Sequence, residues 1–412
     1  FTNPAEFILQ LSQATVLRQA FSERQLYETV VDFWTNHFNI YIMKDNDRWL
    51  KLVDDREVIR PYALGKFRDL LGASAHSAAM LVYLDNITNT KGVAQENYAR
   101  ELLELHTVGV NGGYTQTDVQ ELARVLTGWT VTPPRRNAFG VTVNDNTGTF
   151  VFNPQTHDTG TKTVLGLKLG NNGVKEGEAV LDMLARHPST AKFIATKLVR
   201  RFVTDNPPAS LVERVADTFG KTDGDIKQVL RVLLHSDEFR QSFGFKVKRP
   251  AEFVAAATRA LNATVTRPNV NVNLRPNNTP PRNPAQVLGD PLILALRTMG
   301  QLPFQWPTPD GYPDYADAWV NSNNLLARWN LALAMVANQV PGLKFDLAGQ
   351  MQDAKIGSAA AAVDFWARRL LNRALPDNDR ATLINYMGGD ISQIKIRDLV
   401  ALLLASPHFQ YR

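Results

Sequence analysis

The sequence predicts a mainly α-helical protein, a multi-helical bundle with a small β-hairpin insertion near residues 139–169. Two observations lead to this fold class. Apolar residues recur every three or four positions over most of the chain, which places them on one face of an α-helix. Residues 141–152 instead alternate apolar and polar side chains about a polar turn that contains a glycine, which is typical of a β-hairpin.

The first 131 residues are expected to be helical. From Glu23 to Ile42 the apolar side chains follow the helical spacing closely. These residues are Tyr27, Val30, Val31, Trp34, Phe38 and Tyr41. We therefore expect an amphipathic helix whose buried face is largely aromatic.

Four more helices are expected in the same part of the chain. They cover residues 59–71, 77–84, 97–108 and 117–126. Gly109 is placed to end the third helix, because glycine is common just past a helix C-terminus. Thr117 or Asp118 is placed to cap the fourth, because both residue types accept hydrogen bonds from the first helical N–H groups.

The rest of the chain divides by composition. Residues 132–173 are expected to form the β insertion, with a second short strand pair at 162–169. Helices resume over residues 174–261. Residues 262–290 are rich in Asn, Pro, Thr and Arg without periodicity, which predicts a long loop. Residues 291–412 are expected to be helical, and we expect residues 1–131 and all these segments to form one compact domain.

One internal repeat is visible. Copy 1 lies within residues 174–261 and copy 2 covers about residues 360–412. Each copy has a helix, a break that contains proline, a second helix, and an apolar helix followed by Ser-x-x-Phe. Two copies are too few for a solenoid, so we interpret them as a duplicated three-helix unit.

Length, charge and missing residue types exclude several classes of protein. The 412 residues are 44% hydrophobic and carry a net charge of +5 from 45 basic and 40 acidic residues spread along the chain. A nucleic-acid-binding protein concentrates its basic residues, so we expect no nucleic-acid partner. The chain has no cysteine, which excludes disulfides and metal–thiolate sites. No run of 18 apolar residues is present, so we expect no membrane span.

Several segments, in chain order, resemble the DUF1800 family of proteins of unknown function. They include Asp32–Phe38, Tyr83–Asn86, Glu96–Leu105, Leu126–Trp129, His157–Lys162, Gly300–Phe304 and Ser406–Gln410. The resemblance implies an exported bacterial protein that is periplasmic, on the outer surface or secreted. It implies no reaction, because the family has no established activity. Since the chain begins at Phe1 without Met or a signal peptide, we expect a family member that has lost its N-terminal portion.

The most informative segment is Gln95–Gly109. On a helical wheel Asn97, Arg100, Glu101 and Glu104 form one polar stripe. Glu101 and Glu104 lie roughly 60° apart, so the two carboxylates share a face. One hypothesis is that both are catalytic or bind a metal, while Asn97 and Arg100 contact the substrate.

Two other interpretations of this stripe stay open. It is also explained by a solvated helix face on which Arg100 pairs with Glu104 at i,i+4 spacing. The alternative is a buried ion pair with an arginine of another helix. The arginines considered are Arg60, Arg124 and Arg328.

His106 suggests a metal site together with the two carboxylates, because imidazole and carboxylate both bind first-row metals. However, it lies roughly 140–160° from Glu101 and Glu104 on the wheel. We therefore interpret His106 as a core histidine, and His37, on the flank of the aromatic helix face, in the same way. Any metal or cofactor is unknown from the sequence, although a divalent metal at the carboxylates is one hypothesis.

His157 and Asp158 form the best loop candidate. They follow a predicted strand, with Gly160 and Lys162 close by. A histidine beside a carboxylate can act as a general base or a ligand, so we predict His157 and Asp158 as catalytic and Lys162 as substrate-binding. The alternative is a turn in which Asp158 bonds local backbone and His157 is exposed.

An aromatic, proline-rich passage supplies the last candidates. Residues 300–314 contain Trp306 and Tyr312, which we predict as substrate-binding because aromatic faces suit sugar rings or peptide segments. Packing of a core is the competing explanation.

Two functions follow. The first is an exported hydrolase or other enzyme that acts on an extracellular polymer such as a polysaccharide through the Glu, His and Asp side chains. The second is a non-catalytic extracellular binding or assembly protein, whose partner is a polysaccharide or another exported protein and whose polar motifs are structural networks.

Overall fold

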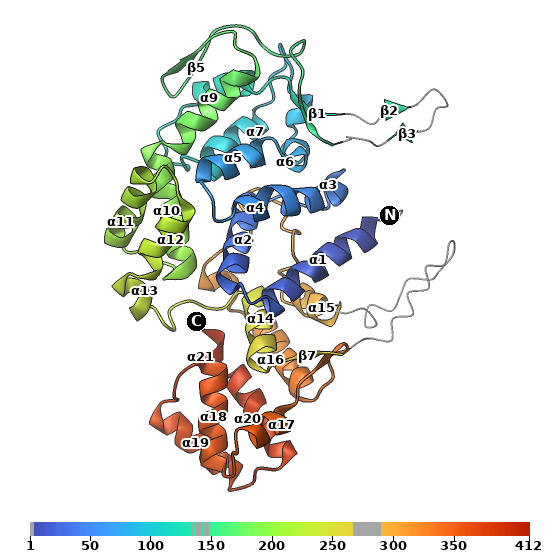
Figure 1. Ribbon diagram of the computed structural model, residues 1–412, viewed down its shortest axis with the longest axis vertical. Coiled ribbons are helices and arrows are strands. Elements are labelled where there is room, and N and C mark those ends of the chain that lie inside the picture. The colour runs from blue at the N-terminus through green and yellow to red at the C-terminus, as the bar shows by residue number, and fades with distance from the viewer. Residues whose placement is uncertain (1–3, 133–134, 137–141, 144–147, 267–289) are drawn as a thin grey trace. The chain divides into compact units, whose positions relative to one another are not determined.

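A computed structural model describes residues 4–132, 135–136, 142–143, 148–266 and 290–412 (Figure 1). Within these residues the structure is mainly α-helical, and the strands pair as short antiparallel two-stranded sheets. The predicted fold class is confirmed. Among the described residues, no helix has both the length and the apolar character needed to cross a membrane.

Contacts between Cα atoms divide the chain into two compact units. Unit 1 comprises Phe1–Leu11, Arg24–Ser242 and Phe304–Tyr312, and unit 2 comprises Ser12–Glu23, Phe243–Pro303 and Pro313–Arg412. The helix α1 (Pro4–Phe21) contributes residues to both. The expected arrangement of five segments in one compact domain stays a prediction.

Unit 1 contains most of the predicted helices. Before its sheets come α2 (Gln25–His37), α3 (Asp47–Val53), the π-helical turn η1 (Asp54–Ile59), α4 (Arg60–Tyr62), α5 (Phe67–Ala75), α6 (Ala78–Tyr83), η2 (Asn86–Thr88), α7 (Glu96–Glu101), the π-helical turn η3 (Leu102–His106) and α8 (Gln116–Val125). After them come α9 (Val174–Ala185), α10 (Pro188–Phe202), α11 (Ala209–Lys221), α12 (Ile226–Leu234) and α13 (Asp237–Gln241). The aromatic face of α2 is buried as predicted, with Trp34 and Phe38 in the core.

Two helix predictions are corrected. The helix expected over residues 59–71 is interrupted between α4 and α5, where the main chain of Phe67 donates to the Gly224 carbonyl at 2.8 Å. The cap of α8 is Thr115 rather than Thr117 or Asp118. The Thr115 hydroxyl accepts the Asp118 N–H at 3.2 Å, and the Asp118 carboxylate accepts the Thr115 N–H at 2.8 Å, which is a capping box.

The β insertion pairs differently from the prediction. Strand β4 (Phe150–Phe152) pairs with β1 (Trp129–Val131), and β3 (Thr142–Val143) pairs with β2 (Arg135–Arg136). The expected hairpin within residues 141–152 is therefore wrong, because β4 pairs with the earlier strand that begins at the buried Trp129. The turn of that hairpin lies outside the described residues.

The second strand pair is confirmed. Strands β5 (Lys162–Val164) and β6 (Leu167–Leu169) are antiparallel. Side chains of α8 hold this hairpin: Glu121 accepts the Thr163 N–H at 3.0 Å, and Asp118 accepts the Leu165 N–H at 2.7 Å. Helix α9 packs closely on Trp129 at Gly177, where a Cβ atom would lie 2.2 Å from the tryptophan ring. Only glycine allows this approach of helix and tryptophan.

In its described residues unit 2 is helical with one small sheet. Its elements are α14 (Pro250–Ala260), β7 (Thr264–Val265), α15 (Asp290–Thr298), η5 (Ala316–Ala318), α16 (Ser322–Val336), β8 (Leu343–Lys344), α17 (Leu347–Asp353), α18 (Ala359–Leu371), α19 (Asp377–Met387), α20 (Gln393–Ala405) and α21 (Pro407–Gln410). Strand β7 pairs with β8. Most of the predicted loop over residues 262–290, namely 267–289, lies outside the described residues.

The two repeat copies have the same order of helices. Copy 1 runs α10, α11, α12 and the short α13, and copy 2 runs α18, α19, α20 and the short α21 (Figure 1). In copy 1 the Ser236 hydroxyl caps the short helix by accepting the Phe239 N–H at 3.1 Å. Ser406 occupies the equivalent N-cap position in copy 2.

Candidate functional site

The predicted polar stripe begins on α7. The Gln95 side chain accepts the Asn97 N–H at 3.4 Å and so caps the helix. Tyr98 is buried, whereas Glu101, the last residue of α7, is half-buried. The chain then continues as the π-helical turn η3 and reaches Gly109. Turns of this kind are rare inside helices and frequently lie at functional sites.

Two buried histidines hold η3. The His37 Nδ1 atom lies 2.9 Å from the Lys197 ammonium, and its Nε2 atom lies 3.1 Å from the His106 main-chain oxygen. Because an ammonium only donates, Nδ1 accepts and the Nε2–H donates. Burial, and then the charge of Lys197, lowers the pKa of His37 well below its ordinary value and that of His106 to about 3. Both are neutral core histidines, as predicted.

Glu101 has an unusual electrostatic environment. Burial raises the pKa of its carboxyl to about 7, the charges of Glu104 and Asp310 act in the same direction, and Arg100 opposes them. Glu104 is also half-buried and accepts the Tyr114 hydroxyl at 3.2 Å. A carboxyl with a pKa near 7 can both give and take a proton at neutral pH.

The loop Phe304–Tyr312 belongs to the same unit and is fixed to α2 and the residues after it. The Asn39 amide donates to the carbonyls of Trp306 at 3.0 Å and Thr308 at 2.7 Å. Asn36 exchanges two hydrogen bonds with the Tyr312 main chain, at 2.7 and 2.9 Å. A Cβ at Gly311 would lie 2.3 Å from the Asn36 carbonyl oxygen, so this close approach requires glycine.

The loop presents two aromatic rings beside a carboxylate. The ring centres of Trp306 and Tyr312 lie 4.9 Å apart at 48°. The Trp306 indole N–H donates to Asp310 at 3.0 Å, and the Thr308 hydroxyl donates to the same carboxylate at 2.5 Å. The aromatic pair is thereby fixed in orientation.

Tyr83 connects the loop with the helix. Its hydroxyl donates to the Pro307 carbonyl at 2.8 Å. Burial raises the pKa of Tyr83, and the negative charges of Asp310 and Glu101 add to this rise. Both charges therefore lie near enough to the phenol to act on it, and Asp310 also acts on Glu101. We use the name carboxylate site for a group of neighbouring side chains in unit 1 and the loop beside them. Its members are Tyr83, Glu101, Glu104, Tyr114 and the loop residues Trp306, Asp310 and Tyr312.

The ion pairs considered for the stripe are not formed. Arg100 pairs with Glu96 at 3.0 Å and donates to Gln116 at 2.8 Å, rather than pairing with Glu104. Each arginine considered as a buried partner has other contacts. Arg60 pairs with Glu28, Arg124 with Asp158, and Arg328 donates to Gln410. Within the described residues the two carboxylates thus lack an arginine partner.

Asn97 is oriented toward a neighbouring turn. Its amide donates to Asp85 at 3.1 Å, and Lys44 pairs with the same carboxylate at 2.7 Å. Asp85 has a positive φ of 62°, which aspartate tolerates better than most residues. Asn97 is therefore tied to a structural turn, while its predicted contact with a substrate stays a prediction.

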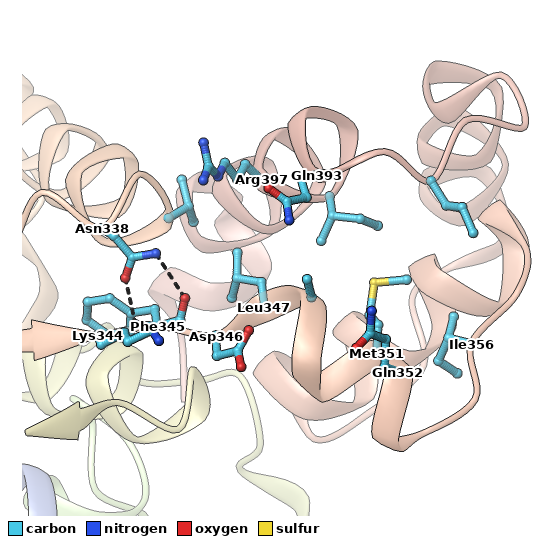
Figure 2. A pocket seen from close by; sticks show the side chains of 14 residues that line it. Asn338, Lys344, Phe345, Asp346, Leu347, Met351, Gln352, Ile356, Gln393 and Arg397 are labelled. Carbon is cyan, nitrogen blue, oxygen red and sulfur yellow. Dashed lines mark hydrogen bonds between the residues drawn. The ribbon is translucent and has the colours of Figure 1, made fainter.

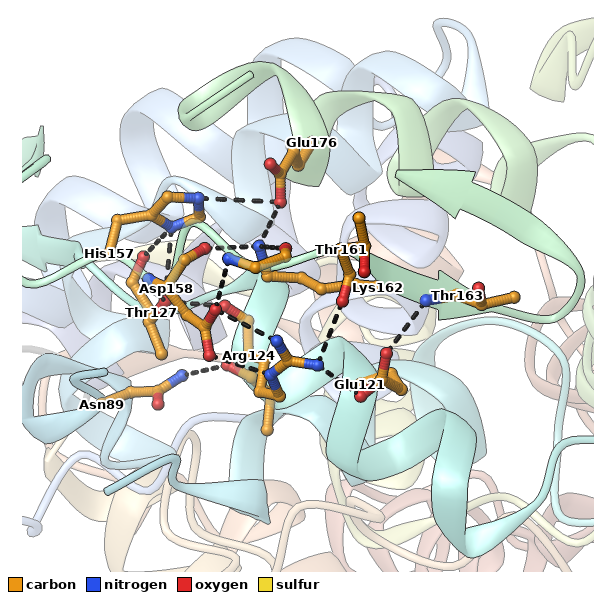
Figure 3. Close-up of polar contacts among 12 residues, drawn as sticks. Asn89, Glu121, Arg124, Thr127, His157, Asp158, Thr161, Lys162, Thr163 and Glu176 are labelled. Atoms are coloured by element: carbon orange, nitrogen blue, oxygen red, sulfur yellow. Dashed lines mark hydrogen bonds and ion pairs between the residues drawn. The ribbon is translucent and has the colours of Figure 1, made fainter. Parts of the chain in front are cut away.

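His157, Asp158 and Lys162 form a second polar cluster, the His157 network, which Figure 3 shows. The Lys162 ammonium pairs with Glu176 at 2.7 Å and donates to the main-chain carbonyls of Asp158 and Gly160. Lys162 and Glu176 have fully buried side chains. Each charge in this pair is matched by an opposite charge.

His157 and Asp158 also have polar partners (Figure 3), although the His157 Nε2 atom, 3.6 Å from Glu176, is buried without a hydrogen-bond partner among the described residues. His157 is 2% exposed, and its Nδ1–H donates to the Thr127 carbonyl at 2.8 Å. Asp158 accepts two hydrogen bonds from Arg124, at 2.8 and 3.1 Å, and one from the Gly160 N–H at 2.8 Å. The Arg124 guanidinium lowers the pKa of Asp158 to about 2.

These contacts match the turn interpretation in part. Asp158 does bond the local backbone, but His157 is buried rather than exposed. The contacts favour a structural role for the network. Catalysis by His157 and Asp158, and substrate binding by Lys162, stay predictions.

A metal site is not formed by the described side chains. Among them, no three His, Asp or Glu residues are arranged to hold an ion.

A separate pocket of about 330 Å³ lies in unit 2, between α16, α17 and α20 (Figure 2). Asn338 closes one side by two hydrogen bonds with the Phe345 main chain, at 3.1 and 2.7 Å. The pocket contains none of the predicted site residues.

Three residues of the carboxylate site escaped sequence reasoning. Tyr83 ends α6 and reads as an apolar helix residue, Tyr114 lies in a turn, and Asp310 lies in a loop without periodicity. The one available signal was that Tyr83 lies in a segment that carries the family resemblance.

Comparison with known proteins gives one match. A family model described as a protein of unknown function (DUF1800) matches residues 2–411. No curated protein and no solved structure matches the chain.

Proposed function

Because the chain belongs to the DUF1800 family, whose function is unknown, we propose its activity from the carboxylate site itself. We propose that the protein is a hydrolase that cleaves a polysaccharide, with Glu101 as general acid and Glu104 as its carboxylate partner. The observation that carries the proposal is the half-buried Glu101, whose pKa is raised to about 7 beside a second carboxylate.

The chemistry follows from the two protonation states. Cleavage of a glycosidic bond needs a carboxylic acid that protonates the leaving oxygen and a carboxylate that activates water or attacks the sugar. Glu101 keeps a proton near neutral pH because burial, Glu104 and Asp310 all disfavour its charged form. Glu104 supplies the second carboxyl group and accepts the Tyr114 hydroxyl at 3.2 Å. One site thus offers an acid and a base.

The neighbouring loop supports a carbohydrate substrate. The tilted rings of Trp306 and Tyr312 offer apolar faces, and sugar rings pack their C–H faces on such surfaces. Asp310 and Asn97 add polar groups that could bond hydroxyls. Arg100, which is partly exposed and held by Glu96, adds a cation at the rim.

We also propose that the protein is exported, since the family resemblance implies it and a polysaccharide substrate fits an extracellular or periplasmic location. The alternative is a binding or assembly protein that recognises the same polymer without cleaving it. The two differ in whether new reducing ends are produced.

The test is the release of reducing ends from neutral and acidic polysaccharides by the wild-type chain and by Glu101→Gln and Glu104→Gln. We expect each variant to lose about 10²- to 10⁴-fold in kcat, the usual effect of removing a general acid or base. Glu57→Gln is the control, because Glu57 is exposed and pairs with Arg56 on the surface.

The pH dependence adds a second readout. Because the reaction needs protonated Glu101, activity should fall as the pH rises above about 7. Binding of a polysaccharide without new reducing ends, or full activity in Glu101→Gln, would reject the hydrolase.

A further inference from the structure

Unit 2 contains a group of cations that the proposed hydrolase does not use. Residues 246–248 and 410–412 run antiparallel: the Lys248 N–H donates to the Gln410 carbonyl, and the Arg412 N–H donates to the Lys246 carbonyl, both at 2.8 Å. This pairing places Lys248 beside cations of three other segments. The members of this cation cluster are Lys248, Arg328, Arg373 and Arg412.

Two members have neutral partners. Arg328, which is 1% exposed, donates to the Gln410 side chain at 2.9 Å and to the Lys248 carbonyl at 2.8 Å. The Lys248 ammonium donates to the carbonyls of Phe409 and Tyr411, each at 2.6 Å. Neutral acceptors satisfy these donors but leave the positive charges unmatched.

Arg373 is a third cation with a neutral hydrogen-bond partner. It donates to the His408 Nδ1 atom at 3.4 Å and stacks 4.9 Å from the centre of the half-exposed Phe243 ring. His408 in turn donates to Asp379 at 2.8 Å, so that carboxylate reaches the cluster only through the imidazole.

Cations outnumber carboxylates among the described groups that most affect Lys248. Of the charged groups that act on Lys248, three are cations and one, Glu252, is an anion. Glu252 is already in contact with Arg249 at 3.8 Å and with Arg412 at 3.2 Å. The Nε–H groups of Arg328 and Arg373 are buried without a hydrogen-bond partner among the described residues. Buried donors of this kind normally have an acceptor.

Burial and the neighbouring charges change the pKa of Lys248. Burial lowers its pKa to about 7, and the three arginines act in the same direction against Glu252. Burial also lowers the pKa of Arg328 to about 10. An anion bound here would favour the charged form of Lys248 and offset the repulsion.

We propose that the cation cluster binds an oxyanion, the sulfate, phosphate or carboxylate group of a ligand, between Lys248, Arg373 and Arg412. Guanidinium groups match oxyanions because two of their N–H donors point in parallel toward two oxygens. Arg412 and Arg373 are partly exposed, which gives an anion access from solvent.

The test uses the full chain and inorganic sulfate. Sulfate is titrated at pH 6 by calorimetry, and its effect on the melting temperature is compared with that of sodium chloride at equal ionic strength. We expect saturable binding of one sulfate and a stabilisation that chloride does not give. Equal stabilisation by both salts, or no saturable binding, overturns the proposal.

Variants locate the site. Arg373→Gln should weaken sulfate binding about tenfold, the loss expected when one charge-assisted hydrogen bond is removed. Arg369→Gln is the matched control, because Arg369 is an exposed arginine outside the cluster, on the helix α18 that ends at Leu371 just before Arg373. Equal affinity in both variants contradicts the assignment.

The pH dependence provides a readout that does not need a variant. As the pH rises through about 7, Lys248 loses its proton and sulfate affinity should fall. Lys248→Arg should keep its affinity at pH 8, because arginine stays charged. An affinity that is constant from pH 6 to 8 in the wild type counts against Lys248. Phosphate and acetate, titrated in parallel, distinguish a tetrahedral from a carboxylate ligand.

Discussion

The His157 network and the carboxylate site contain the same kinds of side chain but differ in how their charges are matched. In the network, Lys162 meets Glu176 at 2.7 Å, and Arg124 lowers the pKa of Asp158 to about 2. In the carboxylate site, Glu101 lies near carboxylates, and its pKa rises to about 7. Matched charges hold a structure together, whereas unmatched ones keep a group reactive near neutral pH.

The comparison predicts that the network is the more important for stability. Lys162→Met removes a buried ammonium and leaves the Glu176 carboxylate buried without its partner. We expect a loss of about 3–5 kcal/mol in the free energy of unfolding, the usual cost of breaking a buried pair. Denaturant titration measures it. Arg186→Gln, which breaks an exposed pair with Asp223, is the control and should change the stability by about 0.5 kcal/mol or less. Equal losses in the two variants would contradict a structural network.

Asp47 is a second carboxyl group with unmatched charge, and it should make the stability of the fold depend on pH. Asp47 is buried, neither oxygen has a hydrogen-bond partner among the described residues, and burial raises its pKa to about 8. In the unfolded chain an aspartate titrates near about 4. Between these values the folded state holds a proton that the unfolded state releases, so stability should fall as the pH rises from about 4 to about 8.

Asp47→Asn should remove this dependence. Relative to wild type, we expect the variant to gain on the order of 5 kcal/mol as the pH rises from 4 to 8. The measurement is denaturant unfolding at both pH values. Parallel pH profiles for the two proteins would show that Asp47 titrates normally.

The aromatic loop should affect binding more than stability. Trp306→Ala removes one ring of the pair with Tyr312. We expect KM for the polysaccharide to rise about three- to tenfold, which corresponds to about 0.5–1.5 kcal/mol for one aromatic contact, with little change in kcat. Trp329→Ala, at an exposed tryptophan of unit 2, is the control. A fall in kcat with constant KM would place Trp306 in the chemistry instead.

The smallest effect is expected at the rim. Arg100→Gln breaks a partly exposed pair with Glu96, and such pairs contribute about 0.5 kcal/mol or less. Thermal unfolding in low and high salt checks this. A larger loss would mean that Arg100 stabilises the carboxylates after all.

Much of the helical fold could be predicted because its signals are local. The spacing of Val30, Trp34 and Phe38 identified α2, and Gly109 identified the end of η3. The polar stripe was found in the same way. What the helical wheel missed is that the α-helix ends at Glu101, because a π-helical turn is fixed by the distant His37.

The long-range parts could not be derived from spacing. Helix α7 and the loop that contains Trp306 are far apart in the sequence, yet charges from both act on Tyr83. The position of the loop depends on its hydrogen bonds to Asn36 and Asn39. The role of Lys162 was also hidden, since its partner Glu176 lies on a helix beyond the hairpin. Pairing of β4 with β1 likewise depends on burial of Trp129 rather than on the turn sequence.

The proposed hydrolase depends on Glu101 keeping its proton near neutral pH. A carbon-13 NMR titration of the glutamate carboxyl groups, with Glu101→Gln to assign the signal, measures this pKa directly. We expect a carboxyl that titrates with a pKa of about 7 and is missing from the variant. A Glu101 signal that titrates near the ordinary glutamate value of about 4.3 would contradict the carboxylate site and the hydrolase proposed from it.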